Sequence, residues 1–347
     1  MVNLYYFIND YSEGAHPKII ERMVSTNLEQ TSGYGSDPHS ENAKLLIKQA
    51  CGRTDIDVHL LVGGTQTNLT IICASLRPHQ GVFCTVPSHI NTHEAGAIER
   101  TGHKVLSLPG NDGKLAAADV EQHFLKYKND PSCEHWVQPK MVYISQPTEI
   151  GSLYNKQELT DLHTICKKYN LYLFIDGARM GYGLTAYNND LSLFDITNLC
   201  DVFYIGGTKC GALFGEAVVV INPLLKEDFF SISKQSGAVL AKGRLLGIQF
   251  ETLFTDNLYE KICRHGIDMA MQIKKAIEEK GLPVVTNSHT NQQFPILNNT
   301  MFKKLSEKYV LAPWEIIDEN TTAVRICTSW ATDEAQVKAL IKEIEAL

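Results

Sequence analysis

The chain has 347 residues, of which 44% are hydrophobic and 20% charged, which are ordinary values for a globular protein with a sizeable core. Its formal net charge of −7 gives no reason to expect nucleic acid or an anionic membrane surface as a partner. No stretch approaches the ~20 apolar residues of a membrane-spanning helix, and the amino terminus lacks the basic start and apolar run of a signal peptide.

The nine cysteines are odd in number and widely scattered, without a C-x-x-C pair. Several lie in apolar segments, where a reduced thiol behaves as a small hydrophobic group. We therefore expect free thiols and a cytoplasmic protein, with no disulfide framework and no metal site.

Short apolar runs alternate with helical patterns between about residues 58 and 222. The runs are rich in β-branched and aromatic residues and mostly lack polar alternation, as is typical of strands buried on both faces. The predicted strands are 58–62, 82–86, 105–108, 141–145, 172–176, 202–205 and 217–221, and the predicted helices include 68–76, 95–100 and 156–169. This order predicts an α/β fold with a mostly parallel central sheet and helices on both of its sides.

The pattern changes from about residue 250. The predicted elements are helix 267–280, strand 284–285, a helix near 299–309, strand 323–328 and helix 333–346, with Thr332 as the expected N-cap of the last. We expect two domains: residues 1–249 form an N-terminal segment with a large domain, and residues 250–347 form a smaller C-terminal α+β domain.

A lysine and an aspartate each stand where a predicted strand ends. Asp176 closes the run 172–176, and Lys209 follows the run 202–205 after two glycines and a threonine. The carboxyl ends of parallel strands meet at one edge of a sheet, where ligands bind. An amine and a carboxylate at that edge are what pyridoxal phosphate requires, because the amine binds its aldehyde carbon and the carboxylate keeps its ring nitrogen protonated. Taken singly, either residue could equally be a surface group.

The segment 62–69 joins a predicted strand to a predicted helix and contains Gly63, Gly64 and Thr65. Glycines let the backbone approach a ligand closely, and the free amides of a first helical turn bind phosphate. The segment matches neither the dinucleotide fingerprint nor the P-loop, and an ordinary tight turn explains it equally well.

His89 follows the predicted strand 82–86 and a proline. Its ring could stack on a pyridine ring and carry protons near neutral pH, or it could be a loop histidine bonded to the backbone. His93 and Glu94 are weaker candidates of the same kind.

Two arginines are candidate anion ligands. Arg179 stands three residues after Asp176, where it could hold a phenolic oxygen of the cofactor or a carboxylate through paired hydrogen bonds. Arg325 lies inside a predicted apolar strand, and burying its charge without a partner would be costly. It is therefore either an outward-facing residue of an edge strand or a group that reaches from the small domain to an amino-acid carboxylate.

Four motifs together resemble the threonine aldolase/β-eliminating lyase family. They are Gly-Gly-Thr-x-x-Asn at 63–68, Ser-His-Ile-x-x-x-Glu-Ala-Gly at 88–96, Ile-Asp-Gly-Ala-Arg at 175–179 and Gly-Gly-Thr-Lys at 206–209. The resemblance runs from about residue 5 to the C-terminus. It implies the fold of the fold type I pyridoxal phosphate enzymes, which are similar to the aspartate aminotransferases.

The resemblance also implies roles for individual residues. Lys209, Asp176 and His89 would be catalytic: the lysine attaches the cofactor, the aspartate pairs with its pyridine nitrogen and the histidine stacks on its ring. The implied cofactor-binding set is Lys209, Asp176, His89, Gly64, Thr65, Arg179, Thr208 and Lys242. The implied substrate-binding set is Asn9, Tyr34, Arg179 and Arg325. Tyr34 and Lys242 are expected to reach the site of a partner subunit.

The chain departs from the family pattern at several places. Asn9 stands where many members have a serine, and residues 145–149 read Ser-Gln-Pro-Thr-Glu where many members have Glu-Asn-Thr-His. A second histidine found in several aldolases has His135 as its nearest counterpart. The proton acceptor stays open between His89, His135, Glu94 and an ordered water.

The activity that the resemblance implies is pyridoxal-phosphate-dependent cleavage of L-threonine or L-allo-threonine to glycine and acetaldehyde. One alternative is β-elimination, or another pyridoxal reaction, on a different β-substituted amino acid. Another is a catalytically silent module that binds the cofactor or an amino acid. We expect a homodimer or homotetramer with sites completed across the dimer.

Overall fold

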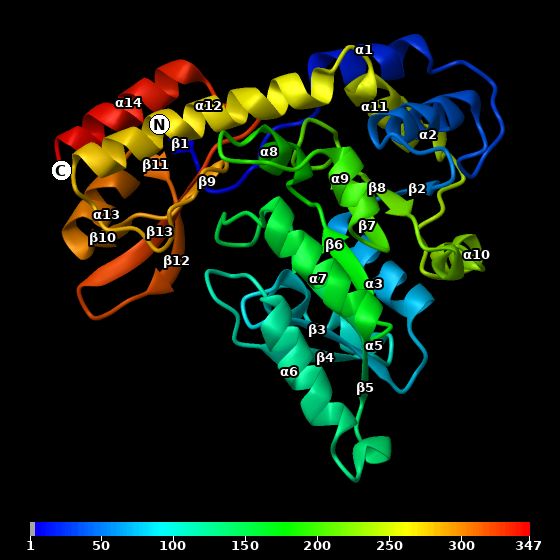
Figure 1. Ribbon diagram of the computed structural model, residues 1–347. Coiled ribbons are helices and arrows are strands. Elements are labelled where there is room, and N and C mark those ends of the chain that lie inside the picture. Colours follow the sequence, from blue (N-terminus) through cyan, green and yellow to red (C-terminus); the bar gives the residue numbers. More distant parts are fainter. Residues whose placement is uncertain (1–3) are drawn as a thin grey trace.

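A computed structural model describes residues 4–347 of the protein, and at its centre is a seven-stranded sheet (Figure 1). The strands of this sheet are β2 (Asp57–Leu61), β3 (Gln80–Thr85), β4 (Lys104–Leu108), β5 (Gln138–Ser145), β6 (Tyr172–Asp176), β7 (Val202–Gly206) and β8 (Glu216–Val220). Each corresponds to one predicted strand, so the apolar runs located all seven.

The strands are arranged in the order β2-β8-β7-β6-β5-β3-β4. Only β8 runs antiparallel to its neighbours β2 and β7, whereas the pairs from β7 to β4 are parallel. The predicted α/β fold with a mostly parallel sheet is therefore confirmed. Because the parallel strands share one direction, their carboxyl ends, and the loops that follow them, lie at the same edge.

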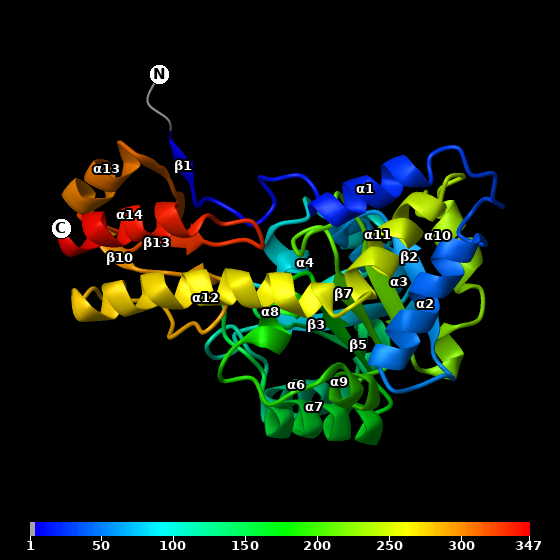
Figure 2. The same cartoon turned by 90° about the horizontal axis from the view of Figure 1, so that it is seen from above.

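Helices cover both faces of the sheet. Alternate residues of β5 enter two different hydrophobic cores, with Val142 and Ile144 in one and Met141 and Tyr143 in the other. The first core is completed by α2 (Pro38–Ala50), α6 (Ala117–Lys128), α7 (Lys156–Lys168), α9 (Leu193–Asn198) and α11 (Arg244–Phe254). The second is completed by α3 (Gly64–Ser75), α4 (His89–Thr92), α5 (Ala97–Arg100) and α10 (Phe229–Gln235). Figure 2 shows α6, α7 and α9 together along one side of the sheet.

The C-terminal part contains a smaller antiparallel sheet. Its strands are β9 (Gln292–Gln293), β10 (Ile296–Asn298), β12 (Ala312–Ile316) and β13 (Thr321–Cys327), and α13 (Asn299–Ser306) and α14 (Glu334–Glu345) accompany it. The predicted strand 284–285 is wrong, since Val284 forms only an isolated bridge with Pro295. The expected N-cap is wrong by one residue, because the Asp333 side chain, rather than that of Thr332, accepts from the Ala335 N–H and caps α14.

The N-terminal strand packs with this C-terminal part. Strand β1 (Tyr5–Tyr6) pairs in parallel with β11 (Tyr309–Val310), and Phe7 is fully buried in the core that also contains Leu297 and Leu340. The start of the chain thus joins the smaller unit, although we expected it to accompany the large domain. Residues 1–3 of that expected domain lie outside the described part, and the boundary near residue 250 stays a prediction.

Helix α12 (Leu258–Glu279) connects the two units. Its first half contributes Ile262 and Ile267 to a core of the large sheet, and its second half contributes Ile273 and Ile277 to the core of the small unit. The sequence pattern predicted only its last part, from residue 267. The remaining helices are α1 (Pro17–Ser25), α8 (Met180–Thr185) and two 3₁₀ turns, Cys133–His135 and Pro223–Leu225.

All nine cysteines are free thiols, and seven of them are buried. Within residues 4–347, no helix combines the length and apolarity needed to cross a membrane. The same residues contain no cluster of three or more side chains suited to hold a metal ion.

A buried histidine ties the segment between α1 and α2 to α11. His39 Nδ1 lies 2.8 Å from Glu251 Oε2, and His39 Nε2 lies 2.8 Å from Glu29 Oε2. Burial by itself lowers the pKa of His39, but the hydrogen bonds and charges of the two glutamates outweigh it and raise the pKa above its ordinary value. The ion pairs therefore favour the protonated ring.

We expect His39→Gln to lower the free energy of unfolding more at about pH 5.5 than at about pH 9. A raised pKa in the folded state gives a contribution that is complete below the ordinary pKa and is lost as the pH rises through the folded-state pKa. Urea unfolding of both proteins at the two pH values measures this. His135→Gln, at an exposed position, is the matched control and should show no such pH dependence. An equal loss at both pH values for His39→Gln would contradict the assignment.

Candidate active site

Residues from five strand ends meet at the carboxyl edge of the large sheet. A cavity of about 50 Å³ lies there and is lined by residues that include Gly64, His89, Glu149, Asp176, Arg179 and Lys209. Gly64 follows β2, His89 follows β3, Glu149 follows β5, Asp176 is the last residue of β6, and Lys209 follows β7. Lys209 and Asp176 therefore lie at the same edge of the sheet, as predicted.

Asp176 is buried as an anion. Because it is two residues beyond Phe174, it points to the same sheet face as Tyr143 and Tyr204 of the neighbouring strands. Both phenols donate to its carboxylate at 2.5 Å, and Asn68 Nδ2 and the Ala178 N–H donate at 3.0 and 2.9 Å. Burial by itself raises the pKa of Asp176, but the two phenol hydrogen bonds outweigh it and hold the pKa below its ordinary value. A fixed negative charge of this kind suits a protonated ring nitrogen.

Lys209 lies opposite in the same cavity. Burial and the charge of Arg179 lower its pKa, although nearby acidic side chains act in the opposite direction. A lowered pKa increases the share of the neutral amine, which is the nucleophilic form. A hydrogen bond positions the loop that carries Lys209, since the Tyr182 hydroxyl donates to the Lys209 carbonyl oxygen at 2.8 Å.

A buried glutamate supports this loop and was missed at the level of sequence. Glu216, the first residue of β8, accepts from Thr208 Oγ1 at 2.9 Å and from the Gly207 N–H at 3.2 Å. Burial raises the pKa of Glu216 to about 8. Thr208, predicted to bind the cofactor, therefore has its hydroxyl engaged with Glu216.

Glycines make the meeting of β6 and β7 possible. A Cβ on Gly177 would lie 1.9 Å from the Tyr204 carbonyl oxygen, and one on Gly206 would lie 2.2 Å from the Ala178 carbonyl oxygen. A side chain at either position would push the two strand ends apart. The glycines that follow Asp176 and precede Lys209 thus keep these two groups in one cavity.

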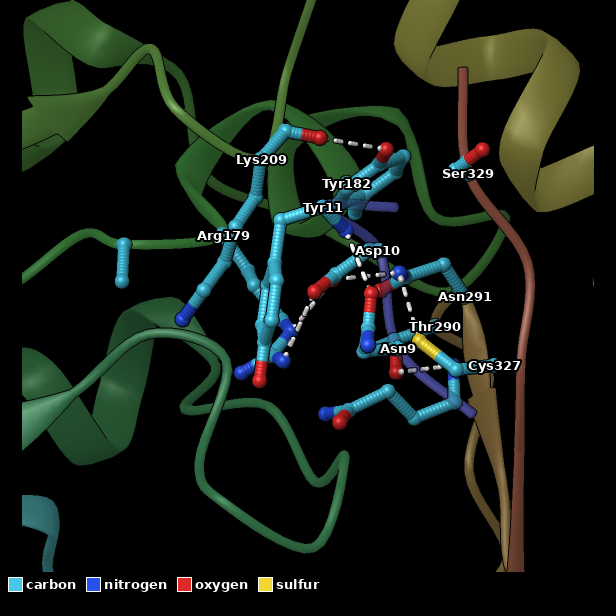
Figure 3. A network of polar contacts seen from close by, with 12 residues as sticks. Asn9, Asp10, Tyr11, Arg179, Tyr182, Lys209, Thr290, Asn291, Cys327 and Ser329 are labelled. Atoms are coloured by element: carbon cyan, nitrogen blue, oxygen red, sulfur yellow. Dashed lines mark hydrogen bonds and ion pairs between the residues drawn. The ribbon is translucent and has the colours of Figure 1, made fainter. Parts of the chain in front are cut away.

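Arg179 is held by an acidic partner far away in the sequence. Its Nε and Nη2 donate to the two carboxylate oxygens of Asp10 at 2.6 and 3.0 Å, and Asn291 Nδ2 donates to the same carboxylate at 2.9 Å (Figure 3). Burial by itself raises the pKa of Asp10, but the charges of Arg179 and Lys209 hold it below its ordinary value. This pairing leaves Nη1 as the guanidinium nitrogen with which Arg179 can bind an anion.

Asn9 was predicted to bind the substrate, whereas no role was predicted for the neighbouring Asp10. Asn9 Oδ1 accepts from the Tyr11 N–H and from Ser12 Oγ, both at 2.9 Å, so this oxygen shapes the turn that follows. The substrate contact expected of Asn9 stays a prediction.

Arg325 borders a second, larger cavity that also contains Lys209. This cavity has a volume of about 460 Å³ and is lined by residues that include Tyr11, His89, Glu149, Arg179, Trp314 and Arg325. Arg325 Nη2 donates to the Ile8 carbonyl oxygen at 2.8 Å, and its guanidinium carbon lies 5.4 Å from the centre of the Trp314 ring. Its Nε is buried and has no partner among the described residues. The position of Arg325 at this cavity fits the anion-binding alternative rather than the outward-facing one.

A polar chain links His89 to Asp176. His89 Nδ1 lies 2.8 Å from Glu94 Oε1, and this oxygen also accepts from Asn68 Nδ2, which in turn donates to Asp176. The Glu94 side chain is fully buried. Glu94 therefore orients His89 instead of meeting a substrate.

Other predicted site residues lie apart from these two cavities. Thr65 is exposed in the first turn of α3, whose first amides are free of a side-chain cap. Lys242 is exposed. Lys234 Nζ lies 4.1 Å from the centre of the Tyr34 ring, and Tyr34 lines a separate pocket. Their roles toward a partner subunit stay predictions. His135 lies in the 3₁₀ turn before β5, at the opposite edge of the sheet, so it does not meet Lys209.

Residues 8–300 of the chain match the family described as beta-eliminating lyase. The chain belongs to this family. A low specificity L-threonine aldolase of a Pseudomonas species is 28% identical, over 98% of this chain and 97% of that protein. The solved structure of a Leishmania major threonine aldolase is 46% identical and superposes with a TM-score of 0.96 over 99% of both chains. A Thermus thermophilus aspartate aminotransferase shares the fold, with a TM-score of 0.71 at 13% identity over 99% of this chain and 92% of that one.

We expect Asp10→Ala to lower the free energy of unfolding of this lyase by about 3–5 kcal/mol, because it leaves the guanidinium of Arg179 buried without its partner. Urea unfolding at neutral pH measures this. Asp55→Ala is the matched control, since it breaks the exposed Arg53–Asp55 pair and should change the stability little. Equal effects of the two substitutions would show that burial of the Asp10–Arg179 pair is not what matters.

Proposed function

We propose that this lyase cleaves the Cα–Cβ bond of L-threonine and L-allo-threonine, giving glycine and acetaldehyde, with pyridoxal phosphate as its cofactor. The observation that carries the proposal is the pairing of Lys209, with a lowered pKa, and the buried Asp176 anion in one cavity that opens toward Arg325. The threonine aldolase names of relatives that span nearly the whole chain support the choice of substrate.

The residues present fit pyridoxal phosphate. Lys209 would attach it, Asp176 would bind its ring nitrogen, and His89 would cover its ring. Gly64 and Thr65, in the uncapped first turn of α3, would bind its phosphate through backbone amides. The bound cofactor would act as an electron sink for the bond that breaks at Cα.

The chain's own groups would select which bond breaks. Arg325, and Arg179 through Nη1, would bind the substrate carboxylate and so fix the rotation about Cα. The wide cavity beside Trp314 leaves room for the β-substituent. In this arrangement the orientation set by the arginines favours cleavage of the bond to Cβ. We further propose that the active form is a homodimer or homotetramer in the cytoplasm, with Tyr34 and Lys242 of each subunit reaching the site of another.

The direct test is to incubate the cofactor-loaded protein with L-threonine and to quantify glycine and acetaldehyde together. We expect equimolar products, and we expect Lys209→Ala to lose both the products and the visible absorbance of the attached cofactor, because it lacks the amine. Lys275→Ala controls for loss of a lysine as such, because Lys275 is exposed on α12 and lines neither cavity, and it should keep the absorbance band. Bound cofactor with no acetaldehyde would favour β-elimination on a different amino acid.

Arg325→Ala should raise KM for L-threonine about 10- to 100-fold while cofactor binding stays intact, since a hydrogen bond to a charged group contributes about 1.5–3 kcal/mol. Arg325→Lys keeps the charge but lacks the two-pronged geometry, and it should recover only part of the loss. Steady-state kinetics and a cofactor titration measure both effects. Unchanged KM in Arg325→Ala would remove this residue from the substrate site.

A further inference from the structure

Glu149 stands at the junction of the two cavities of the active site and lines both of them. It follows β5 by four residues and is 9% exposed. The sequence marked this position only as a departure from the family pattern. Its carboxyl group lies between the cavity that holds Asp176 and Lys209 and the cavity that opens toward Arg325.

One carboxyl oxygen of Glu149 accepts two hydrogen bonds, and the other has no hydrogen-bond partner among the described residues. Oε1 accepts from Ser145 Oγ at 2.7 Å and from the His89 N–H at 2.9 Å. Since both donors bind Oε1, Oε2 is the oxygen available to a ligand. Two donors on a single oxygen also hold the carboxyl plane in place, as proton transfer requires.

The surroundings of Glu149 favour proton uptake. Burial raises its pKa above the ordinary value, and the charge of Asp176 acts in the same direction, while the Ser145 hydrogen bond opposes them. Behind it, burial raises the pKa values of Tyr143 and Tyr154 and raises that of Cys84 to about 12, so these groups stay neutral. The charged or titratable groups that share its cavities are Tyr11, His89, His93, Asp176, Arg179, Tyr204, Lys209 and Arg325.

We propose that Glu149 accepts the proton of the substrate β-hydroxyl, a role that rests on the function proposed above. The O–H proton passes to Oε2, and its electron pair remains on oxygen and forms the second bond of the aldehyde C=O. The Cα–Cβ bond breaks, and its electron pair stays with Cα. One proton then reaches Cα to give glycine, and Glu149 returns one proton to solvent, so protons and electrons balance.

The other candidates fit this role less well. His135 lies at the opposite edge of the sheet, and the Glu94 side chain is fully buried against His89 and Asn68. His89 would lie flat on the cofactor ring in the role proposed for it. Glu149 alone among these acidic and histidine candidates combines an available oxygen with a place in both cavities.

The test is Glu149→Gln, which keeps an oxygen for Ser145 and His89 but cannot accept the proton. We expect kcat for L-threonine to fall about 10²- to 10⁴-fold, with loss of the acid limb of the pH profile. The absorbance of the attached cofactor and the affinity for glycine, which has no hydroxyl, should be unchanged. In the protein without cofactor, a ¹³C carboxyl resonance that titrates above the ordinary glutamate range should be missing from the variant.

A second variant tests the proposal without altering Glu149. Ser145→Ala removes one donor from the carboxylate, so it should raise the pKa of Glu149 further and move the acid limb of the wild-type profile to higher pH. An unmoved limb, or near wild-type cleavage by Glu149→Gln, would overturn the proposal. Wild-type cleavage of threonine is measured first, because its absence would refute the proposed function itself.

Discussion

Retention of charge at a buried sheet edge is the constraint on which the rest of the site depends. Asp176 is 5% exposed, and burial by itself raises its pKa, but hydrogen bonds from two phenols, an amide and a backbone N–H outweigh burial and hold it as an anion. The same edge buries Arg179, whose charge is balanced by Asp10. Each ion therefore has partners from a different part of the chain, and the cavity exists only when strands, helices and the N-terminal segment are all in place.

The sequence predicted the fold well because its strongest signals are local. Buried parallel strands appear as unbroken apolar runs, and a polar residue followed by glycine marks the end of such a run, which located Asp176 and Lys209. Short edge strands and polar bridges carry no such signal. The run of two β-branched residues at 284–285 is too short to distinguish a strand from the isolated bridge that Val284 forms.

Local sequence patterns could not predict the site residues whose roles depend on contacts with distant parts of the chain. Asp10 meets Arg179 across 169 positions, and nothing in the order of residues 8–11 separates its role from that of Asn9. Glu149 lies in the loop after β5, and Glu216 lies just before the predicted strand 217–221, so no local pattern shows that Glu149 lines both cavities or that Glu216 accepts from Thr208. A buried carboxylate is recognised by its donors, and those donors come together only in three dimensions.

The path of the chain between the two units limits how the site can open. One crossing is α12, a continuous helix of 22 residues and so about 33 Å long, and the other is the extended segment that leads from β1 through Asp10 to the large unit. Because α12 packs into the cores of both units, a change in their relative position must bend this helix or disturb the contact of Asp10 with Arg179. Any movement of the two units that widened the site would therefore act on the same ion pair that positions Arg179.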